Sequence, residues 1–118
     1  MRLVILESPY KARWFWQRWL NRRYARRAMR DSVMRGEAPI ASHLIYTQRG
    51  ILRDGDPHER DMGIAAGLEW GKVADVTVVY ADRGISAGMW FGIEAAKTAG
   101  RPVEHRFINA KGPEPSKK

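Results

Sequence analysis

Cysteine is absent from this chain of 118 residues, and histidine is scarce. Without cysteine the protein has neither a disulfide framework nor a thiolate metal site. The three histidines, His43, His58 and His105, show no metal-ligand spacing to one another, so no metal site is predicted. Long hydrophobic runs are lacking too, since the N-terminal run ends at Glu7, too early for a signal peptide or a membrane span. We therefore expect a cytoplasmic protein without a cofactor and without a membrane partner.

The balance of charge is strongly positive, with 21 Lys and Arg residues against 13 Asp and Glu residues and a net charge of +8. A field of this sign attracts nucleotides, nucleic acids or acidic proteins. Arginines concentrate between Arg13 and Arg35, where Asp31 is the only acidic residue. The charge pattern therefore indicates an anionic partner.

Apolar segments of strand length alternate with helical patterns along the chain. We expect strands over residues 2–6, 38–40, 76–80 and 103–107, and helices over 14–34, 57–71 and 87–99. The segment Val76–Tyr80 carries no charge and is rich in β-branched residues, which predicts a strand buried on both faces. Short connections and right-handed crossovers then give an α/β fold, a parallel sheet in the strand order 2-1-3-4 with helices on both faces.

Residues 1–109 are expected to form a single domain, because the alternation is continuous and the length is a common domain size. The remaining residues, 110–118, hold two prolines and two terminal lysines and predict a disordered tail. Residues 47–56 are polar, contain two glycines and would suit a lid over the edge of the sheet.

A ligand crevice is predicted where the first and third strands lie side by side, outside their carboxyl ends. After the strand at 76–80 the chain becomes glycine-rich and then helical, and such a junction leaves backbone N–H groups free to hold an anion. His43 can serve there as an acid, a base or a hydrogen-bonding wall. A structural interpretation stays open, in which Gly84 and Gly88 let the backbone turn and Ser86 caps the helix. The predicted ligand contacts are Ser8, Pro9, Tyr10, Ser42, His43, Asp82, Ile85, Ser86, Gly88 and Met89.

The helix expected over 14–34 has two different faces. One face is assigned to the sheet and consists of Leu20, Tyr24, Ala25, Ala28, Met29 and Ser32. The other combines the rings of Phe15 and Trp19 with the guanidinium groups of Arg22 and Arg26. Such a face suits base stacking and phosphate binding in a nucleic-acid complex. A subunit interface and a solvated arginine face are two further interpretations, and all three stay open.

Several segments of the chain resemble an uncharacterised domain family of phages and bacteria. They are SPY at Ser8–Tyr10, YARRAMRDSVMRGEAPIASHLIYTQ at Tyr24–Gln48, PHERDMGIAAGLEWG at Pro57–Gly71, and VVYADRGISAGM at Val78–Met89, followed by GI and GRPVEHR. That family is similar to the nucleoside 2-deoxyribosyltransferase superfamily, which includes N-glycosidases that hydrolyse deoxynucleoside 5′-monophosphates. The resemblance implies a small flavodoxin-like (Rossmann-like) parallel sheet, a nucleotide or nucleoside ligand, and a homo-oligomer in which a neighbouring subunit completes the crevice.

The resemblance also implies roles for particular residues. Ser86 and Gly88 match the positions that hold the sugar or the 5′-phosphate, and Asp75 matches an aspartate with a structural role. Gly92 stands where those enzymes carry the glutamate that attacks the anomeric carbon of deoxyribose. The nearest carboxylate, Glu94, is rotated by about 200° on the helix and is expected to face away from the crevice. The candidate catalytic residues are therefore Glu7, Asp82 and Glu94, with binding without cleavage as the alternative.

Two functions are compatible with the sequence. In the first, the protein holds a nucleoside monophosphate or a related phosphorylated ligand at the strand-end crevice, with N-glycosidic cleavage or transfer as its chemistry. In the second, it is a non-enzymatic phage interaction protein. Such a protein would sequester a nucleotide signal, or bind host nucleic acid or protein through the Arg- and Trp-rich first helix.

Overall fold

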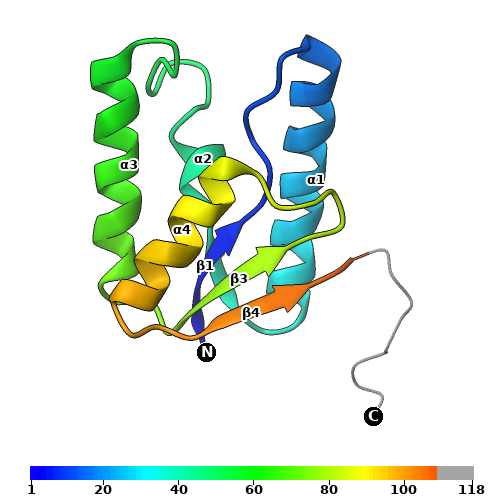
Figure 1. The fold of residues 1–118 in the computed structure, drawn as a ribbon. Coiled ribbons are helices and arrows are strands. Elements are labelled where there is room, and N and C mark those ends of the chain that lie inside the picture. Colours follow the sequence, from blue (N-terminus) through cyan, green and yellow to red (C-terminus); the bar gives the residue numbers. More distant parts are fainter. Residues whose placement is uncertain (109–118) are drawn as a thin grey trace.

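The computed structural model of the chain describes residues 1–108, so the predicted domain end at 109 and the predicted tail over 110–118 lie outside the described residues. Figure 1 shows strands and helices alternating along the chain. In order they are β1 (Leu3–Glu7), α1 (Phe15–Met34), β2 (Ala38–Ile40), α2 (Ser42–Ile45), α3 (Pro57–Gly71), β3 (Val76–Tyr80), α4 (Ala87–Thr98) and β4 (Val103–Arg106). The alternation confirms the predicted fold class.

The four strands form one parallel sheet in the order β2-β1-β3-β4, as the sequence predicts. All five residues of β3 are buried, which confirms that the central strand is covered on both faces. The helix α1 covers one face and α4 covers the other, while α3 stands beside α4 (Figure 1). Within residues 1–108, no helix is long and apolar enough to cross a membrane.

Alternating side chains along β1 decide which of its residues face the site. Val4 and Leu6 are fully buried on the α1 side of the sheet. Ile5 and Glu7 point to the opposite side, because successive side chains of a strand alternate. The sequence predicted that this strand ends at residue 6, but Glu7 still pairs with Val79 of β3. Glu7 is therefore held by the sheet and directed toward α4.

The helix α1 buries most of its predicted face and one further residue. Its buried residues are Asn21, Tyr24, Ala25, Ala28 and Ser32. Leu20 and Met29, which were assigned to the same face, are only half-buried. The helix is followed by Gly36 with φ of 86°, the left-handed conformation that favours glycine after a helix.

Two local features shape the chain around α2 and the start of α3. The residues after β2 form the short helix α2, where an irregular loop was expected. At the start of α3, Asp56 accepts hydrogen bonds from the amides of His58 and Glu59, as an N-cap should. The carboxylate of Glu59 accepts from the Arg53 amide at 2.7 Å, so it fixes the loop that precedes the helix.

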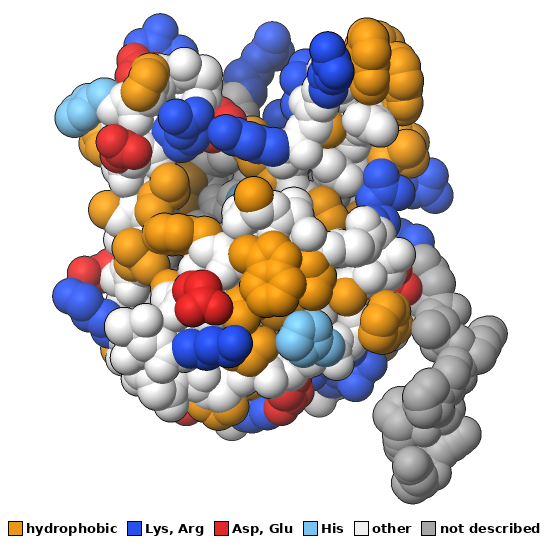
Figure 2. All heavy atoms as spheres, in the orientation of Figure 1, with side chains coloured by type: hydrophobic (Ala, Val, Ile, Leu, Met, Phe, Trp, Pro, Cys, Tyr) orange, Lys and Arg blue, Asp and Glu red, His pale blue; other side chains and the backbone are white. Residues whose placement is uncertain are grey.

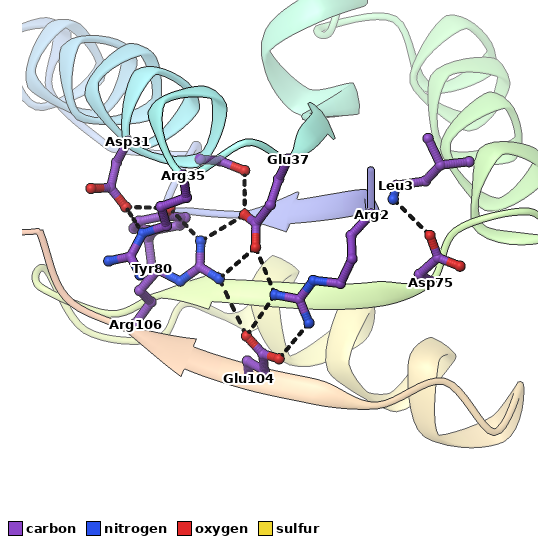
Figure 3. Close-up of polar contacts among 10 residues, drawn as sticks. Arg2, Leu3, Asp31, Arg35, Glu37, Asp75, Tyr80, Glu104 and Arg106 are labelled. Carbon is purple, nitrogen blue, oxygen red and sulfur yellow. Dashed lines mark hydrogen bonds and ion pairs between the residues drawn. The ribbon is translucent and has the colours of Figure 1, made fainter. Parts of the chain in front are cut away.

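A network of ion pairs joins the segment before β2 to the far edge of the sheet (Figure 3). Glu37 accepts from Arg106 at 2.9 Å and from Arg2 at 2.6 Å, and the side chains of Glu37 and Arg106 are each only 9% exposed. The Arg106 guanidinium is the largest cause that lowers the pKa of Glu37 to about 2. Nearby, Asp75 accepts from the Leu3 amide at 2.7 Å, which is a structural role of the kind that the resemblance implied. These contacts stabilise the fold away from the crevice.

Candidate functional site

A cavity of about 780 Å³ lies over β1, between α3 and α4. It begins at the carboxyl edge of the sheet and extends as far as Arg101, just before β4. Figure 2 shows this side of the molecule hollowed, with hydrophobic side chains around the hollow. Ile5 and Glu7 lie beneath the cavity, and its walls come from α2, α3 and α4 together with the segments that follow β1, α2 and α4. The cavity is large enough for a small organic ligand.

The structure brings most of the predicted ligand contacts to this cavity, and it leaves three of them outside. Those that line the cavity are Ser8, Tyr10, Ser42, His43, Ser86, Gly88 and Met89. Those outside are Pro9, Asp82 and Ile85. Ile85 packs instead against the apolar cluster of Val79, Met89 and Ile93.

Asp82 faces the α1 side of the sheet and not the cavity. Its carboxylate accepts hydrogen bonds from the Tyr24 hydroxyl and, at 2.8 Å, from the Ile108 amide. The Tyr24 hydroxyl in turn accepts from the Asp82 amide at 2.9 Å. The reason is alternation, since Asp82 follows Tyr80 by two residues and Tyr80 belongs to the cluster packed against α1. Placing Asp82 at the crevice was therefore wrong, because its carboxylate joins α1 to the end of β4.

Glu94 also lies outside the cavity, as the helical rotation predicted. Its side chain is exposed and forms an ion pair with Lys97 of the same helix at 3.8 Å. Of the three candidate catalytic carboxylates, only Glu7 lines the cavity.

Glu7 and Gly92 meet beneath the cavity. A Cβ atom at position 92 would lie 2.9 Å from Glu7 Oε1 and still closer to Oε2, so the carboxylate fills the space that a side chain on α4 would need. Burial raises the pKa of Glu7 to about 8, and the charge of Arg101 opposes that rise only in part. A half-buried carboxylate with a strongly perturbed pKa at the base of a cavity is a candidate for chemistry.

Ser8 and His43 form a polar pair on the cavity wall. Ser8 Oγ and His43 Nε2 share a hydrogen bond of 2.7 Å. Burial lowers the pKa of His43 to about 4, so the imidazole is neutral at physiological pH. The Tyr10 ring lies edge-on to the same imidazole, with ring centroids 6.2 Å apart. The three side chains form a neutral wall that can hydrogen-bond and stack against a ligand.

The N-terminus of α4 opens into the cavity. Ser86 Oγ accepts from the Met89 amide at 3.3 Å, and the Ser86 amide meets the Met89 thioether at 3.3 Å. These two amides are therefore capped by the protein itself, contrary to the prediction that they are open to a phosphate. The amides of Ala87 and Gly88 have no acceptor within residues 1–108. The Ser86 hydroxyl keeps its proton for a ligand, because a hydroxyl can accept and donate together.

Sequence reasoning missed the contribution of α3 to the site. Gly63, Gly67 and Gly71 repeat every four residues and lie along one side of this helix. A Cβ atom at position 67 would approach Ser42 Oγ to 2.7 Å, and one at position 63 would approach the Leu52 side chain to 3.3 Å. The glycine spacing was visible in the sequence and could have indicated this close approach. Cations that were also missed line the cavity, namely Lys11, Arg60 and Arg101.

The mixed aromatic and basic face of α1 is exposed and lies outside the cavity. Phe15, Trp19, Arg22 and Arg26 are all exposed.

Protein families and solved structures relate the chain to known proteins. The model of a family described as Domain of unknown function (DUF7768) matches residues 2–106. No curated protein matches the chain. Among solved structures, a 2-deoxyribosyltransferase from the psychrotolerant bacterium Bacillus psychrosaccharolyticus is similar, with a TM-score of 0.61 and 21% sequence identity. The match covers 89% of this chain and 72% of that one, and at this identity it establishes a shared fold.

Proposed function

Because the chain belongs to the DUF7768 family, whose function is unknown, we propose a function from its own cavity: it binds a nucleoside 5′-monophosphate and cleaves the N-glycosidic bond. The observation that carries this proposal is the position of one half-buried carboxylate. Glu7 of β1 lies against Gly92 of α4, which is about one helical turn from the open amides of Ala87 and Gly88. The fold shared with a 2-deoxyribosyltransferase adds support for a nucleoside-related ligand.

The phosphate would bind at the start of α4. The amides of Ala87 and Gly88 point out of the first turn, and the helix dipole favours an anion in front of them. A Cβ atom at position 88 would meet no atom within 4 Å, so a ligand can approach this backbone closely. The Ser86 hydroxyl would donate to a phosphate oxygen, and the cations that line the cavity would supply attraction.

The sugar would then lie over Gly92 and Glu7. The distance from the first turn of α4 to Gly92 is about 6 Å, because a helix rises about 1.5 Å per residue. That span is comparable with the span from the 5′-phosphate to the anomeric carbon in a nucleotide. The base would extend toward the neutral wall of Ser8, Tyr10 and His43, which can stack and hydrogen-bond without adding charge.

Glu7 would perform the chemical step as its ionised form. A carboxylate oxygen forms a bond to the anomeric carbon while the bond from that carbon to the base nitrogen breaks, and the electron pair leaves with the base. The base takes a proton from water. A second water then hydrolyses the glycosyl ester, which releases the sugar phosphate and restores the carboxylate. Since the pKa of Glu7 is about 8, the rate should rise with pH up to about that value.

The test is incubation with each deoxynucleoside 5′-monophosphate and chromatographic detection of free base. We expect the wild type to release base with a rate that rises between pH 6 and pH 8. Glu7→Gln keeps the size of the side chain and should bind nucleotide without releasing base. The matched control is Glu94→Gln, the same change on an exposed carboxylate of α4, which should leave base release unchanged. Base release that survives in Glu7→Gln would contradict the assigned chemistry.

Binding is measured separately by calorimetric titration. A nucleoside monophosphate should bind at least about tenfold more tightly than the nucleoside without its phosphate, because charge-assisted hydrogen bonds to the α4 amides are lost. Equal affinity for the two ligands would overturn the placement of the phosphate. No binding of either ligand would overturn the proposed function as a whole.

A further inference from the structure

The first turn of α1 carries a cluster of exposed aromatic rings. We call Trp14, Phe15, Trp16 and Trp19 the aromatic platform. The indole rings of Trp14 and Trp16 are stacked, with centroids 5.2 Å apart and planes 8° from parallel, and Phe15 meets Trp16 edge-on. All four rings are about half exposed or more, and Phe15 is 74% exposed. Contiguous exposed aromatic surface of this kind marks an interaction site.

Positive charge surrounds the aromatic platform. The Arg13 guanidinium lies over the Trp14 ring, and that of Arg23 lies over the Trp19 ring, at 5.9 and 5.7 Å from the ring centroids. The first turn of α1 contains no acidic residue, and its N-cap, Trp14, makes no side-chain capping bond. Figure 2 shows hydrophobic side chains gathered at this free end of α1, with Lys and Arg side chains beside them. A partner for this surface must therefore be both anionic and able to stack.

A second hollow adjoins the cavity and has Arg13, the residue that lies over the Trp14 ring, in its wall. It measures about 500 Å³ and is lined by Tyr10, Lys11, Ala12, Arg13, Arg18 and Asp54. Tyr10, Lys11 and Asp54 line the main cavity as well, so the two hollows are neighbours with a shared wall. An anionic chain that leaves the cavity would pass Lys11 and reach Arg13 at the platform. The hollow thus continues the cavity as far as Arg13 and Arg18, and Arg13 is in contact with the platform through Trp14.

We propose that the nucleotide in the cavity belongs to a single-stranded nucleic acid, whose neighbouring nucleotides stack on the aromatic platform while their phosphates contact Lys11, Arg13 and Arg18. This inference rests on the proposed function and extends it from a free nucleotide to a polymer. Single strands suit the surface because unpaired bases stack on aromatic side chains, while basic side chains follow the phosphates. The phosphates of such a strand would also bind the arginines near the start of α1.

Two other partners fit the surface less well. A second copy of the chain would bring the same arginine-rich helix against itself, and like charges oppose that contact. An anionic membrane would attract the arginines and accept the rings. However, it would not use a hollow that leads into the cavity. Both partners remain outcomes of the test.

The experiment measures fluorescence anisotropy of a labelled single-stranded oligonucleotide about ten nucleotides long, within the range that one small domain occupies. We expect the oligonucleotide to bind at least about tenfold more tightly than a mononucleotide, and its affinity to fall steeply with salt. Trp14→Ala/Trp16→Ala should weaken oligonucleotide binding by about tenfold or more, because base stacking is lost. Arg13→Ala/Arg18→Ala should make the slope of log affinity against log salt concentration shallower, by the amount that corresponds to the loss of about two phosphate contacts. Neither double variant should change mononucleotide affinity.

The matched control is Lys72→Ala/Lys97→Ala, which removes the same charge from exposed side chains of the α3–β3 turn and α4. It should leave the salt dependence unchanged. If this control reduced the salt dependence of oligonucleotide binding as much as Arg13→Ala/Arg18→Ala does, only the net charge of the protein would attract the strand. That result would overturn the inference. Binding that the tryptophan variant does not weaken would overturn it too. So would a concentration-dependent dimer that the tryptophan variant abolishes, or binding to anionic vesicles with which the oligonucleotide does not compete.

The failure of the proposed function has a different signature. If the chemistry assigned to Glu7 is absent, the wild type releases no base from any substrate, yet the oligonucleotide still binds through the platform. If only the inference fails, mononucleotides bind and are cleaved, while the oligonucleotide binds no better than they do. Glu7→Gln should retain full oligonucleotide binding in either case.

Discussion

The carboxylate of Glu7 occupies the volume that a side chain on Gly92 would fill. The two residues come from β1 and α4, and neither element alone would indicate that they meet. The resemblance places a catalytic glutamate at position 92, where this chain has glycine. The structure places a carboxylate at the same point from the neighbouring strand. The site therefore contains a carboxylate even though the sequence has glycine at position 92.

Glu7→Gln should stabilise the protein, and more so as the pH rises. The pKa of Glu7 is about 8 in the folded state and about 4.5 in the unfolded chain, so folding takes up a proton between these values. The folded state therefore loses stability as the pH increases from about 5 to 8, by at most roughly 1.4 kcal/mol per pH unit. Glutamine does not titrate, so the stability of the Glu7→Gln variant does not fall in this way as the pH increases. Urea unfolding of both proteins at pH 5, 6.5 and 8 measures the difference.

A stability difference that does not grow with pH would mean that Glu7 has an ordinary pKa in the folded protein. Glu94→Gln is the control, since this exposed carboxylate pairs with Lys97 at 3.8 Å and should give a small and nearly constant difference.

Glu37→Gln should destabilise the fold by roughly 3–5 kcal/mol at neutral pH, because it leaves the Arg106 guanidinium buried with a weakened partner. The pKa of Glu37 is lowered to about 2 in the folded state from a usual value of 4.5. The contribution of the ionised Glu37 to the free energy of unfolding is therefore complete above about pH 5 and is lost as the pH falls toward 2. Thermal unfolding between pH 2 and pH 7 should show the two proteins converging in acid. A difference that persists at pH 2 would contradict this account.

The sequence predicted the sheet order and most elements because the signals for them are local. Asp56 before Pro57 marks a helix start, and the β-branched residues of 76–80 mark a buried strand, whatever surrounds them. The end of β1 could not be predicted in this way. Glu7 extends the strand only because Val79 of β3 is present to pair with it.

The site was less predictable than the fold, for related reasons. The orientation of Asp82 depends on the side to which Tyr80 points, and this follows from packing against α1. The short helix α2 contains too few residues for a periodic pattern. The cavity itself exists because α3 and α4 stand apart over β1, and no single segment encodes that spacing.

Gly67→Ala should destabilise the protein even though alanine favours helices. A Cβ atom at position 67 would lie 2.7 Å from Ser42 Oγ and 3.0 Å from Ser42 Cβ, so α2 and α3 must separate. Overpacking of this kind costs about 1–3 kcal/mol, against a helix-propensity gain of about 1 kcal/mol. Chemical denaturation measures the resulting change in the free energy of unfolding. Gly88→Ala is the control because its Cβ would meet no atom within 4 Å, and it should be neutral or slightly stabilising. Equal effects of the two substitutions would contradict the close contact between α2 and α3.

The last prediction concerns the shared space of Glu7 and Gly92. Gly92→Glu alone should disrupt the site and lower stability, because its side chain would compete with the Glu7 carboxylate for one position. Glu7→Ala alone should remove base release and leave a small cavity. The double variant Glu7→Ala/Gly92→Glu transfers the carboxylate from β1 to α4.

We expect the double variant to be more stable than the sum of its single changes indicates, and to recover part of the base release that Glu7→Ala removes. Non-additivity of about 1 kcal/mol or more in a double-mutant cycle would measure the shared space. Additive stabilities would show that the two positions do not compete. Stability that recovers without any base release would mean that the chemistry depends on the approach of Glu7 from β1 and not only on a carboxylate at this point.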